Sequence, residues 1–449
     1  MITTYGQRYV EVHPDNPAIA RNEDLCSECG HCFAVCQEDI GVAGRDTKAC
    51  INCGQCTAAC PEGALSIKND VSAVAAAIKD PSKVVIFSTS PSTRVGLDDA
   101  FGYTRGAYEE GKMVSALRAL GGDYVLDVTF SADLTIMEEG TELLNRVLKG
   151  AGPLPQFTSC CPAWVKFVEI YHPDLIPHIS SARSPIGMQG PVIKSYFAAK
   201  HGIDPEKIVS VAVTPCPAKK AEIKRPEFNV AGRSIGKPQM RDNDFVITAK
   251  ELAEWIKAEG IDYENLPDSD FDSIMGKGTG AGLIFGNTGG VMEAALRMAY
   301  TVVEKKPAPD ALLDFEPIRG LRGVKTASVQ LGGHTIKTAV IYGTKNAEEF
   351  MKRDDFNTFH FIEVMTCPGG CISGSGQPQG QIIPPPDSLR KNRIKNMYDE
   401  DRRLPLRNSI DNPEIQQLYK EFLGEPGSEF AEMLLHTKYY RRTGSDAEK

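Results

Sequence analysis

Cysteine residues crowd the N-terminal part of this chain at spacings that suit metal clusters. Eight of the 13 cysteines fall between Cys26 and Cys60, in two runs that each read C-x2-C-x2-C-x3-C. Thiolates at this rhythm ligate [4Fe–4S] cubes, and in paired runs the fourth cysteine of each run ligates the other cube. We therefore predict one cube held by Cys26, Cys29, Cys32 and Cys60, and a second held by Cys50, Cys53, Cys56 and Cys36.

Zinc ions and disulfide bonds are the alternative uses of these cysteines. Paired C-x2-C units are common zinc signatures, but two consecutive four-cysteine runs are typical of bacterial two-cluster ferredoxins. Disulfide frameworks belong mainly to small secreted domains, whereas this chain has 449 residues. His31, beside Cys32, is expected near the cluster or at the surface rather than as a ligand. Gln37 stands where many ferredoxins have proline, at a position that is not a ligand.

Five further cysteines lie in three short motifs that are far apart in the sequence. The motifs are Thr-Ser-Cys-Cys-Pro-Ala-Trp at 158–164, Thr-Pro-Cys-Pro-Ala-Lys-Lys-Ala-Glu at 214–222, and a glycine-rich segment at 363–378. They contain Cys160, Cys161, Cys216, Cys367 and Cys371. Another [4Fe–4S] cube needs four thiolates, so five cysteines leave one thiol without iron.

These three motifs, in this order, resemble the three signatures of the [FeFe]-hydrogenase family, enzymes that interconvert dihydrogen with protons and electrons. The resemblance runs from about residue 25 to the C-terminus. It implies a third cube held by Cys161, Cys216, Cys367 and Cys371. It also implies that Cys371 joins this cube to a two-iron subsite, which carries CO, cyanide and a bridging dithiolate amine and is supplied by maturation proteins. In such a site the protein mainly shapes the pocket around the cofactor.

The resemblance also assigns residues around the two-iron subsite. Lys219 is placed beside one cyanide, where an ammonium group makes a charge-assisted hydrogen bond. Ser92 and the preceding Pro91 match the position that meets the other cyanide. Met365 matches a methionine whose soft sulfur packs on the two irons. Two neighbouring charged residues are expected to be structural: Lys220 and Glu222.

Cys160 is the cysteine left without iron, and the resemblance makes it the proton donor to the bridging amine. A thiol with a reference pKa near ~8.5 can pass a proton near neutral pH when its surroundings assist. By position, the family's proton path continues through Glu139, Ser180 and Glu142. Glu139 and Glu142 stand three apart on one helix face, and Arg146, four beyond Glu142, can pair with it. Without the motif match, residues 137–146 would read as an ordinary amphipathic helix with surface glutamates.

Several motif positions depart from the best-known members of the family, whose signatures read TSCCPGW, MPC and GGGQP. Here Ala163, Thr214 and Ser375 replace glycine, methionine and glycine, and Ile186-Gly187 replaces a common pair of glutamines. None of these changes removes a ligand or a relay residue. They alter pocket volume and polarity, and they indicate a less-studied branch of the family.

Strand and helix patterns alternate around the motifs. Helices are predicted at 71–78, at 132–148 and near 348. Strands are predicted at 83–90, 124–128, 208–214, 337–342 and 359–366, with 283–285 as a further short apolar candidate. The glycine-rich segment 276–282 lacks the spacing of a phosphate-binding loop and is predicted to be a tight or mobile turn.

This alternation predicts an α/β catalytic domain whose two lobes, with mainly parallel sheets, surround a buried iron–sulfur site beyond the strand carboxyl ends. An N-terminal α+β two-cluster ferredoxin domain precedes it. The predicted units are an N-terminal segment (1–24), the ferredoxin domain (25–70), a helical linker (71–82), the catalytic domain (83–384) and a C-terminal helical extension (385–449). By resemblance, the extension matches a segment that some family members carry as a separate small subunit. The alternative is a plain tail that wraps the surface.

Composition limits the partners. The formal net charge is −9, which argues against a nucleic-acid partner. No apolar run reaches the roughly 18–20 residues that span a bilayer, and the N-terminus carries no secretory signal. We therefore expect a cytoplasmic protein with no membrane partner. Because no flavin or nicotinamide motif is present, a reduced ferredoxin or flavodoxin is the expected electron carrier.

Other functions stay open from the sequence. One is a non-enzymatic relative that acts in iron–sulfur assembly, although such relatives lack the full set that includes Cys160, Lys219 and Cys371. Another is a redox sensor, which usually carries a signalling domain for which this chain has no spare length. A simple electron-transfer polyferredoxin would not need the roughly 320 residues that follow the ferredoxin-like part.

Overall fold

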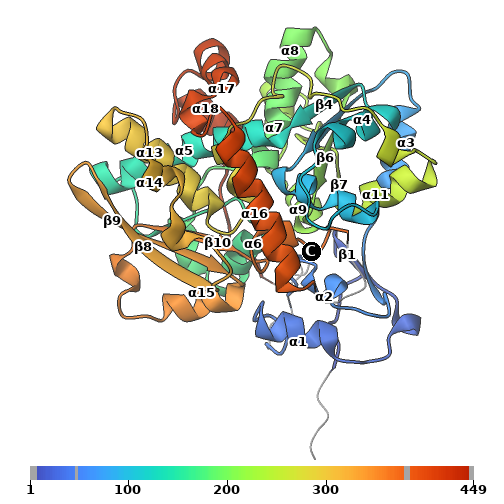
Figure 1. Cartoon of the computed structure of the whole chain (residues 1–449), viewed down its shortest axis with the longest axis horizontal. Helices are drawn as coiled ribbons and strands as arrows, with labels where there is room; N and C mark the ends of the chain where they lie inside the picture. The colour runs from blue at the N-terminus through green and yellow to red at the C-terminus, as the bar shows by residue number, and fades with distance from the viewer. Residues whose placement is uncertain (1–7, 46–48, 379–384, 444–449) are drawn as a thin grey trace, which may run out of the picture.

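The computed structural model describes residues 8–45, 49–378 and 385–443. Two four-stranded sheets lie side by side, with helices around both and the N-terminal unit below them (Figure 1). The predicted α/β architecture with mainly parallel sheets is confirmed. The predicted domain boundary at residue 384 lies outside the described residues.

The first sheet is entirely parallel and has the order β4-β3-β6-β7. Its strands are β3 (Val84–Thr89), β4 (Tyr124–Asp127), β6 (Ile208–Thr214) and β7 (Phe245–Thr248). β6 is buried along its whole length, as expected for a central parallel strand covered on both faces. Three of these strands match the predicted ranges, whereas β7 was not predicted.

The second sheet has the order β5-β10-β9-β8. Its strands are β5 (Gln156–Phe157), β8 (Val324–Leu331), β9 (His334–Tyr342) and β10 (Phe361–Met365). β10 runs parallel to both β5 and β9, while β8 and β9 form an antiparallel hairpin. The strand candidate at 283–285 is wrong: this segment is helical, at the end of α12 (Gly280–Leu283) and in the 3-10 turn Ile284–Gly286.

Close packing explains that helical segment. A Cβ atom on Gly278 would lie 2.1 Å from Thr129 Cγ2, and one on Gly282 would lie 2.5 Å from the Thr129 carbonyl oxygen. The glycines of 276–282 therefore let this turn and α12 approach α5 (Val128–Lys149). α5 begins at the cap Asp127, whose carboxylate accepts a hydrogen bond from Thr129 N, and ends at the left-handed Gly150.

The other helices cover the sheets and connect the lobes. The linker helix α3 spans Val71–Ile78, as predicted. The catalytic domain also contains α4 (Gly111–Ala119), α6 (Pro162–Tyr171), α7 (Pro185–Val192), α8 (Ala198–His201), α9 (Ala218–Glu222), α10 (Val230–Ser234), α11 (Ala249–Ala258), α13 (Gly290–Glu304), α14 (Asp310–Leu313) and α15 (Thr344–Met351).

The N-terminal unit is small and shares a core with the catalytic domain. It contains α1 (His31–Glu38), α2 (Gln55–Ala58) and the antiparallel pair β1 (Ile19–Arg21) and β2 (Leu65–Ile67). Ile40 and Ile51 belong to the same buried cluster as Phe157 and Trp164. The unit is therefore packed against the catalytic domain rather than tethered beside it.

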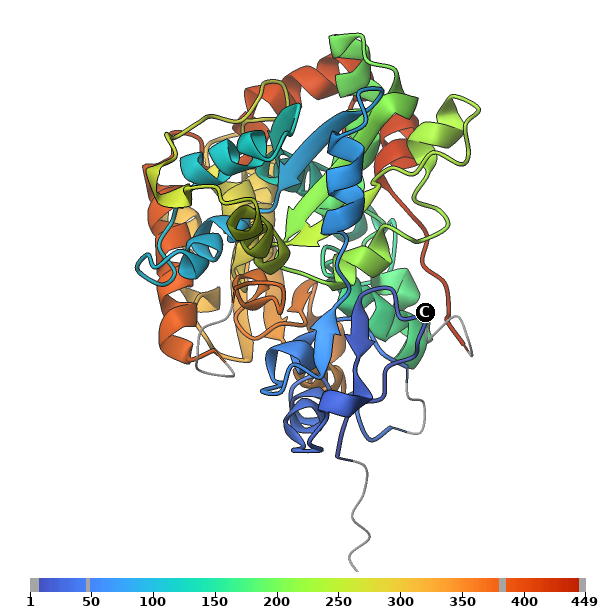
Figure 2. The ribbon, with the colours of Figure 1, turned by 90° about the vertical axis from the view of Figure 1, so that its right-hand side faces the viewer.

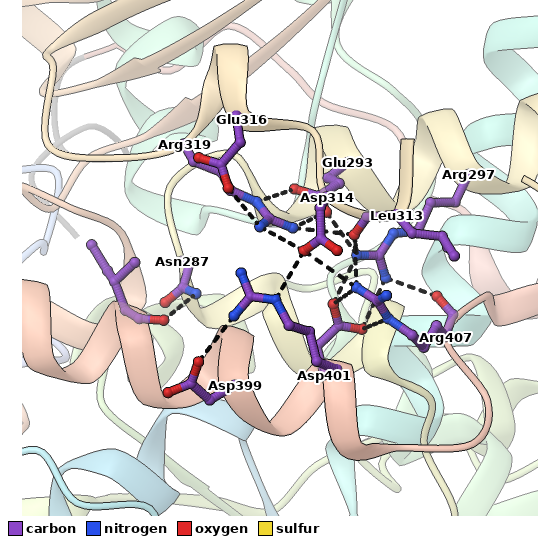
Figure 3. A network of polar contacts seen from close by, with 12 residues as sticks. Asn287, Glu293, Arg297, Leu313, Asp314, Glu316, Arg319, Asp399, Asp401 and Arg407 are labelled. Atoms are coloured by element: carbon purple, nitrogen blue, oxygen red, sulfur yellow. Dashed lines mark hydrogen bonds and ion pairs between the residues drawn. The ribbon is translucent and has the colours of Figure 1, made fainter. Parts of the chain in front are cut away.

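The C-terminal extension is also part of the packed body. Its helices are α16 (Asp387–Arg403), α17 (Pro413–Leu418) and α18 (Glu429–Leu435). α16 crosses the front of the molecule, and the residues after α18 run down toward the N-terminal unit (Figures 1 and 2). A buried ion pair ties α16 to α13, because Arg297 of α13 pairs with Asp401 of α16 as well as with Glu293 of its own helix (Figure 3).

Candidate active site and cluster sites

The cysteines of the catalytic domain lie directly beyond the carboxyl ends of parallel strands. Cys160 and Cys161 follow β5, Cys216 follows β6, and Cys367 follows β10. The two sheets thus direct three motifs that are far apart in sequence toward one region between the lobes, where α/β folds usually place their sites.

Four of these thiols lie close enough to influence one another. Burial and the neighbouring Cys161 raise the pKa of Cys216 to about 12. Burial, Cys216 and Cys161 also raise the pKa values of Cys367 and Cys371. The structure therefore brings together the four residues that the sequence assigned to the third cube. Because iron binds thiolates, loading a cluster here must release protons.

The N-terminal cysteines surround two separate hollows. One is lined by Cys36, Cys50, Cys53 and Cys56. The other is lined by Cys26, Cys29, Cys32 and Cys60. These are the two sets predicted from the exchange of the fourth cysteine between runs. Among the described residues, no three or more Cys, His, Asp or Glu side chains form a site for a single metal ion.

The predicted proton-path residues are neighbours in the structure, and two of their contacts are hydrogen bonds. Ser180 Oγ donates a hydrogen bond of 2.7 Å to Glu142 Oε2, and Arg146 Nη2 donates one of 2.6 Å to Glu142 Oε1. Ser180 also lies close to Glu139, where its hydroxyl offsets part of the rise that burial causes in the pKa of that carboxyl group. The Glu139 carboxyl in turn acts on the Cys160 thiol. The order from inside to outside is thus Cys160, Glu139, Ser180 and Glu142, and the more buried Arg146 holds Glu142 from the side.

Burial keeps protons on the inner members of this line. It raises the pKa of Glu139 to about 8, and it raises the pKa of the Cys160 thiol far above its usual range. Glu139 is completely buried, and its Oε2 atom has no hydrogen-bond partner among the described residues. Near neutral pH both groups therefore hold a proton that they can pass on.

Lys219 points toward this region from α9. Its Nζ atom donates hydrogen bonds to the Cys160 carbonyl oxygen at 3.2 Å and to Glu222 Oε2 at 2.8 Å. Burial alone would lower the pKa of Lys219, but Glu222 and Cys216 raise it. Glu222, expected only to be structural, thus holds the lysine charged and oriented. Lys220 instead binds Asp70 and Glu251.

The remaining predicted pocket residues also lie at strand ends. Pro91 and Ser92 begin a buried 3-10 turn after β3, and Gln377 Nε2 donates a 2.8 Å hydrogen bond to the Ser92 carbonyl oxygen. Met365 is the last residue of β10 and is buried in the core against which Cys160 and Cys371 pack.

Sequence reasoning missed several side chains around the site. Ser159 donates to Glu139 Oε1 from both its backbone N, at 3.1 Å, and its hydroxyl, at 3.3 Å. Glu363 is fully buried and accepts hydrogen bonds from the backbone N of Gly289 at 2.6 Å and of Met292 at 2.8 Å. No pattern in the sequence marks either contact, because each depends on how distant elements pack.

Two hydrogen bonds, one donated from each side, connect the N-terminal unit to this site. Gln55 Nε2 donates to Cys367 Sγ at 3.1 Å, and Ser375 Oγ donates to the Cys53 carbonyl oxygen at 3.1 Å. A Cβ atom on Gly54 would lie 2.3 Å from Ser375 Oγ, so glycine is required for this approach. Ser375, a departure from the family motif, therefore has a structural role here.

Known proteins match most of the chain. The model of the iron-only hydrogenase large subunit, C-terminal domain, matches residues 83–375; that of the iron hydrogenase small subunit matches 387–442; and a 4Fe-4S binding domain matches 42–65.

Curated relatives and solved structures agree with these matches. An NADP-reducing hydrogenase subunit from Solidesulfovibrio fructosivorans is 44% identical over 95% of this chain and 68% of the relative. The large subunit of a periplasmic [Fe] hydrogenase from Nitratidesulfovibrio vulgaris is 47% identical over 69% of this chain and 72% of the relative. A cytosolic iron-sulfur assembly component from Bos taurus is 30% identical over 83% of this chain and 78% of the relative. A structure of a variant of [FeFe]-hydrogenase HydA1 from Chlamydomonas reinhardtii has a TM-score of 0.71 and 35% identity, and covers 83% of this chain and 99% of that one.

Fold and site together define an iron–sulfur oxidoreductase with a thiolate-rich centre between two α/β lobes. More narrowly, the chain belongs to the iron-only, or [FeFe]-, hydrogenase family, which confirms the family predicted from the three cysteine motifs.

Proposed function

We propose that the chain catalyses the reversible reduction of two protons by two electrons to dihydrogen. The observation that carries the proposal is a line of side chains. It runs from the Cys160 thiol, close to Cys371, through the buried Glu139 to Ser180 and the partly exposed Glu142. A plain electron carrier needs no such line. A proton-reducing centre does, because protons must reach a buried metal site from water.

The residues present fit the family's cofactor. Cys161, Cys216, Cys367 and Cys371 are neighbours in the structure, and a [4Fe–4S] cube requires four thiolates. When bound, the cube and its linked two-iron subsite with CO, cyanide and a dithiolate amine would supply the redox chemistry. Cys371 would bridge the two parts, while Lys219, Ser92, Pro91 and Met365 would line the subsite.

The chain's own residues have separate tasks in this proposal. Cys160 would hold the proton nearest the cofactor and would be reloaded by the Glu139 carboxyl group. Ser180 would give its hydroxyl proton to Glu139 as it takes one from Glu142, to which it is hydrogen-bonded. Glu142, held by Arg146, receives protons at the outer end, where its side chain is 18% exposed. Lys219 contributes a fixed positive charge held in place by Glu222.

Electrons would enter through the N-terminal unit. Its two cysteine sets would hold two [4Fe–4S] cubes, and the inner set includes Cys53, whose loop touches Ser375 of the catalytic domain. A ferredoxin or flavodoxin is the proposed electron donor, and maturation proteins are the proposed source of the two-iron subsite. We further propose a cytoplasmic location. Within the described residues, no helix is long and apolar enough to cross a bilayer.

Infrared spectroscopy of protein matured with the family's assembly machinery tests the proposal. We expect bands of metal-bound CO and cyanide, together with hydrogen evolution from reduced viologen. Protein made without maturation should contain iron–sulfur cubes and show no turnover. Matured protein without these bands would contradict the catalytic proposal.

A second candidate is a role in iron–sulfur assembly, which the similarity to the Bos taurus assembly component supports. The relay arrangement favours the hydrogenase, since an assembly protein has no need to move protons to a buried centre. Transfer of a cluster to an acceptor protein, with no hydrogen turnover after maturation, would favour the assembly role instead.

A further inference from the structure

The segment that carries the relay residue Ser180 is held on two sides. On one side, Ile179 forms a parallel bridge with Phe157, and Ser180 N donates to the Phe157 carbonyl oxygen at 2.9 Å. On the other side, Ala182 forms an antiparallel bridge with His436 of the C-terminal extension. The extension therefore completes the small strand-like element on which the relay serine lies.

Backbone hydrogen bonds pair the relay segment with the C-terminal extension in the manner of two antiparallel strands. Arg183 N donates to the Leu435 carbonyl oxygen at 2.9 Å, and Thr437 N donates to the Ser181 carbonyl oxygen at 2.8 Å. Ser181 N in turn donates to Glu142 Oε2 at 3.0 Å, beside the bond from the Ser180 hydroxyl. Displacing the residues around His436 would thus move the donors that hold the outer relay carboxylate.

The His436 ring adds side-chain contacts to both the relay segment and α5. Its Nδ1 atom lies 2.8 Å from Ser181 Oγ, and its Nε2 atom lies 3.0 Å from Glu138 Oε2. Glu138 is completely buried on α5, the helix that also carries Glu139 and Glu142. The imidazole therefore spans from the relay segment to the relay helix and fixes the distance between them.

The groups around the ring belong to several elements. The Glu138 carboxylate also accepts hydrogen bonds from the Tyr419 hydroxyl and, at 2.8 Å, from Gly427 N. Arg183 Nε donates to the His436 carbonyl oxygen at 3.1 Å, while the same guanidinium pairs with Asp242 at 2.8 Å. The His436 side chain is 11% exposed, so the ring has little freedom to leave this position.

We propose that the C-terminal extension holds the proton path in place and that His436 is the residue that positions it. Through Ser181 and Glu138, His436 keeps Ser180 and Glu142 at hydrogen-bond distance. This inference rests on the proposed hydrogenase function, because it assigns His436 to the relay of that reaction. A misplacement of about 1 Å in such a relay can cost on the order of 100-fold in rate.

The test compares His436→Ala with Thr437→Val in the full, matured chain. Thr437 is the matched control, since it is the next residue and its hydroxyl oxygen has no hydrogen-bond partner among the described residues. We expect His436→Ala to lower hydrogen evolution about tenfold and to raise the solvent deuterium isotope effect on turnover, with unchanged CO and cyanide bands. Thr437→Val should keep wild-type values. His436→Asn should recover part of the rate, because its amide can replace Nδ1 beside Ser181.

A double-mutant cycle with Glu142→Ala separates positioning from general damage. If His436 acts through Glu142, the double variant should be no slower than Glu142→Ala alone, whereas independent effects would multiply. Amide hydrogen exchange at residues 180–183, measured in unmatured protein, should also be faster in His436→Ala. The inference would be overturned if the rate losses of His436→Ala and Glu142→Ala multiplied in the double variant. It would also be overturned if His436→Ala were as active as an active wild type. An inactive matured wild type would instead contradict the proposed function, and the exchange measurement would still report on the packing.

Discussion

Gln55 of the N-terminal unit donates a hydrogen bond of 3.1 Å to the sulfur of Cys367 in the catalytic domain. The same amide nitrogen lies 3.3 Å from the Ser373 carbonyl oxygen. Both neighbours are acceptors, so the amide group is oriented with its nitrogen toward the cysteine. The part of the chain proposed to bring in electrons thus touches a proposed ligand of the centre that uses them.

Replacing Gln55 with leucine should make the reduction potential of the catalytic-domain cube more negative. A hydrogen bond to a ligand sulfur stabilises the reduced, more negatively charged cluster, and leucine removes the donor while keeping the volume. The potential is measurable by redox titration with electron paramagnetic resonance on unmatured protein. Gln37→Leu, the same exchange at an exposed position of α1, should leave it unchanged. An unchanged potential in Gln55→Leu would show that the contact does not tune this cube.

Cys160→Ala should lower hydrogen turnover by at least ~100-fold, because the last proton donor is lost. Iron content and the infrared bands of matured protein should stay as in the wild type, since Cys160 is not one of the proposed ligands. Cys216→Ala is the contrasting variant, and it should lose the iron of one cube. Wild-type turnover in Cys160→Ala would remove this thiol from the proton path.

Much of the fold followed from local sequence patterns, whereas the proposed residues of the catalytic domain came from the resemblance to the family. The cysteine spacing predicted both N-terminal ligand sets, and apolar runs predicted β3, β4 and β6, because both signals lie within a few neighbouring residues. β5, with only two residues, is too short to give a periodic signal. The segment 283–285 reads as an apolar strand, yet tight glycine packing against α5 makes it helical.

Gln55 and His436 were not predicted from the sequence for a different reason. Gln55 and His436 each act on a residue more than 200 positions away in the chain. Nothing in their local sequence reveals the partner, because the contact exists only once the N-terminal unit and the C-terminal extension have packed on the catalytic domain. The motif match could assign Cys160 and Glu142, but it could not show what holds them in place.

Glu139→Gln should change how stability depends on pH. The folded state raises the pKa of Glu139 to about 8, against roughly 4.3 in an unfolded chain. Between these values the unfolded state releases a proton that the folded state keeps, so the ionisable side chain destabilises the fold increasingly as pH rises. Relative to wild type, Glu139→Gln should therefore gain about 2.7 kcal/mol between pH 6 and pH 9.

Thermal or denaturant unfolding of unmatured protein at the two pH values measures this difference. Thr135→Val is the control, since it is a neutral exchange at a buried position of the same helix. Its stability difference from wild type should not vary with pH. A pH-independent difference for Glu139→Gln as well would mean that the carboxyl group is not held protonated by burial.

Asp401→Asn should destabilise the protein by about 3 kcal/mol, because it leaves a buried guanidinium without one of its carboxylates. Arg297 donates to both Asp401 oxygens, at 3.0 and 2.8 Å, and both side chains are fully buried. Arg407 also binds Asp401, at 2.7 Å, so this carboxylate joins α16 and the residues after it to α13 (Figure 3). Loss of these ion pairs of Asp401 should lower the melting temperature by several degrees at a fixed scan rate.

Asp399→Asn provides the matched comparison, since it is the same exchange on the same helix. Asp399 pairs with Lys395 and Arg402, whose side chains are 69% and 44% exposed, and exposed ion pairs contribute about 1 kcal/mol or less. Its melting temperature should stay close to that of the wild type. Equal losses in the two variants would mean that the buried network contributes no more than a surface pair, and that apolar contacts of α16 hold the extension in place.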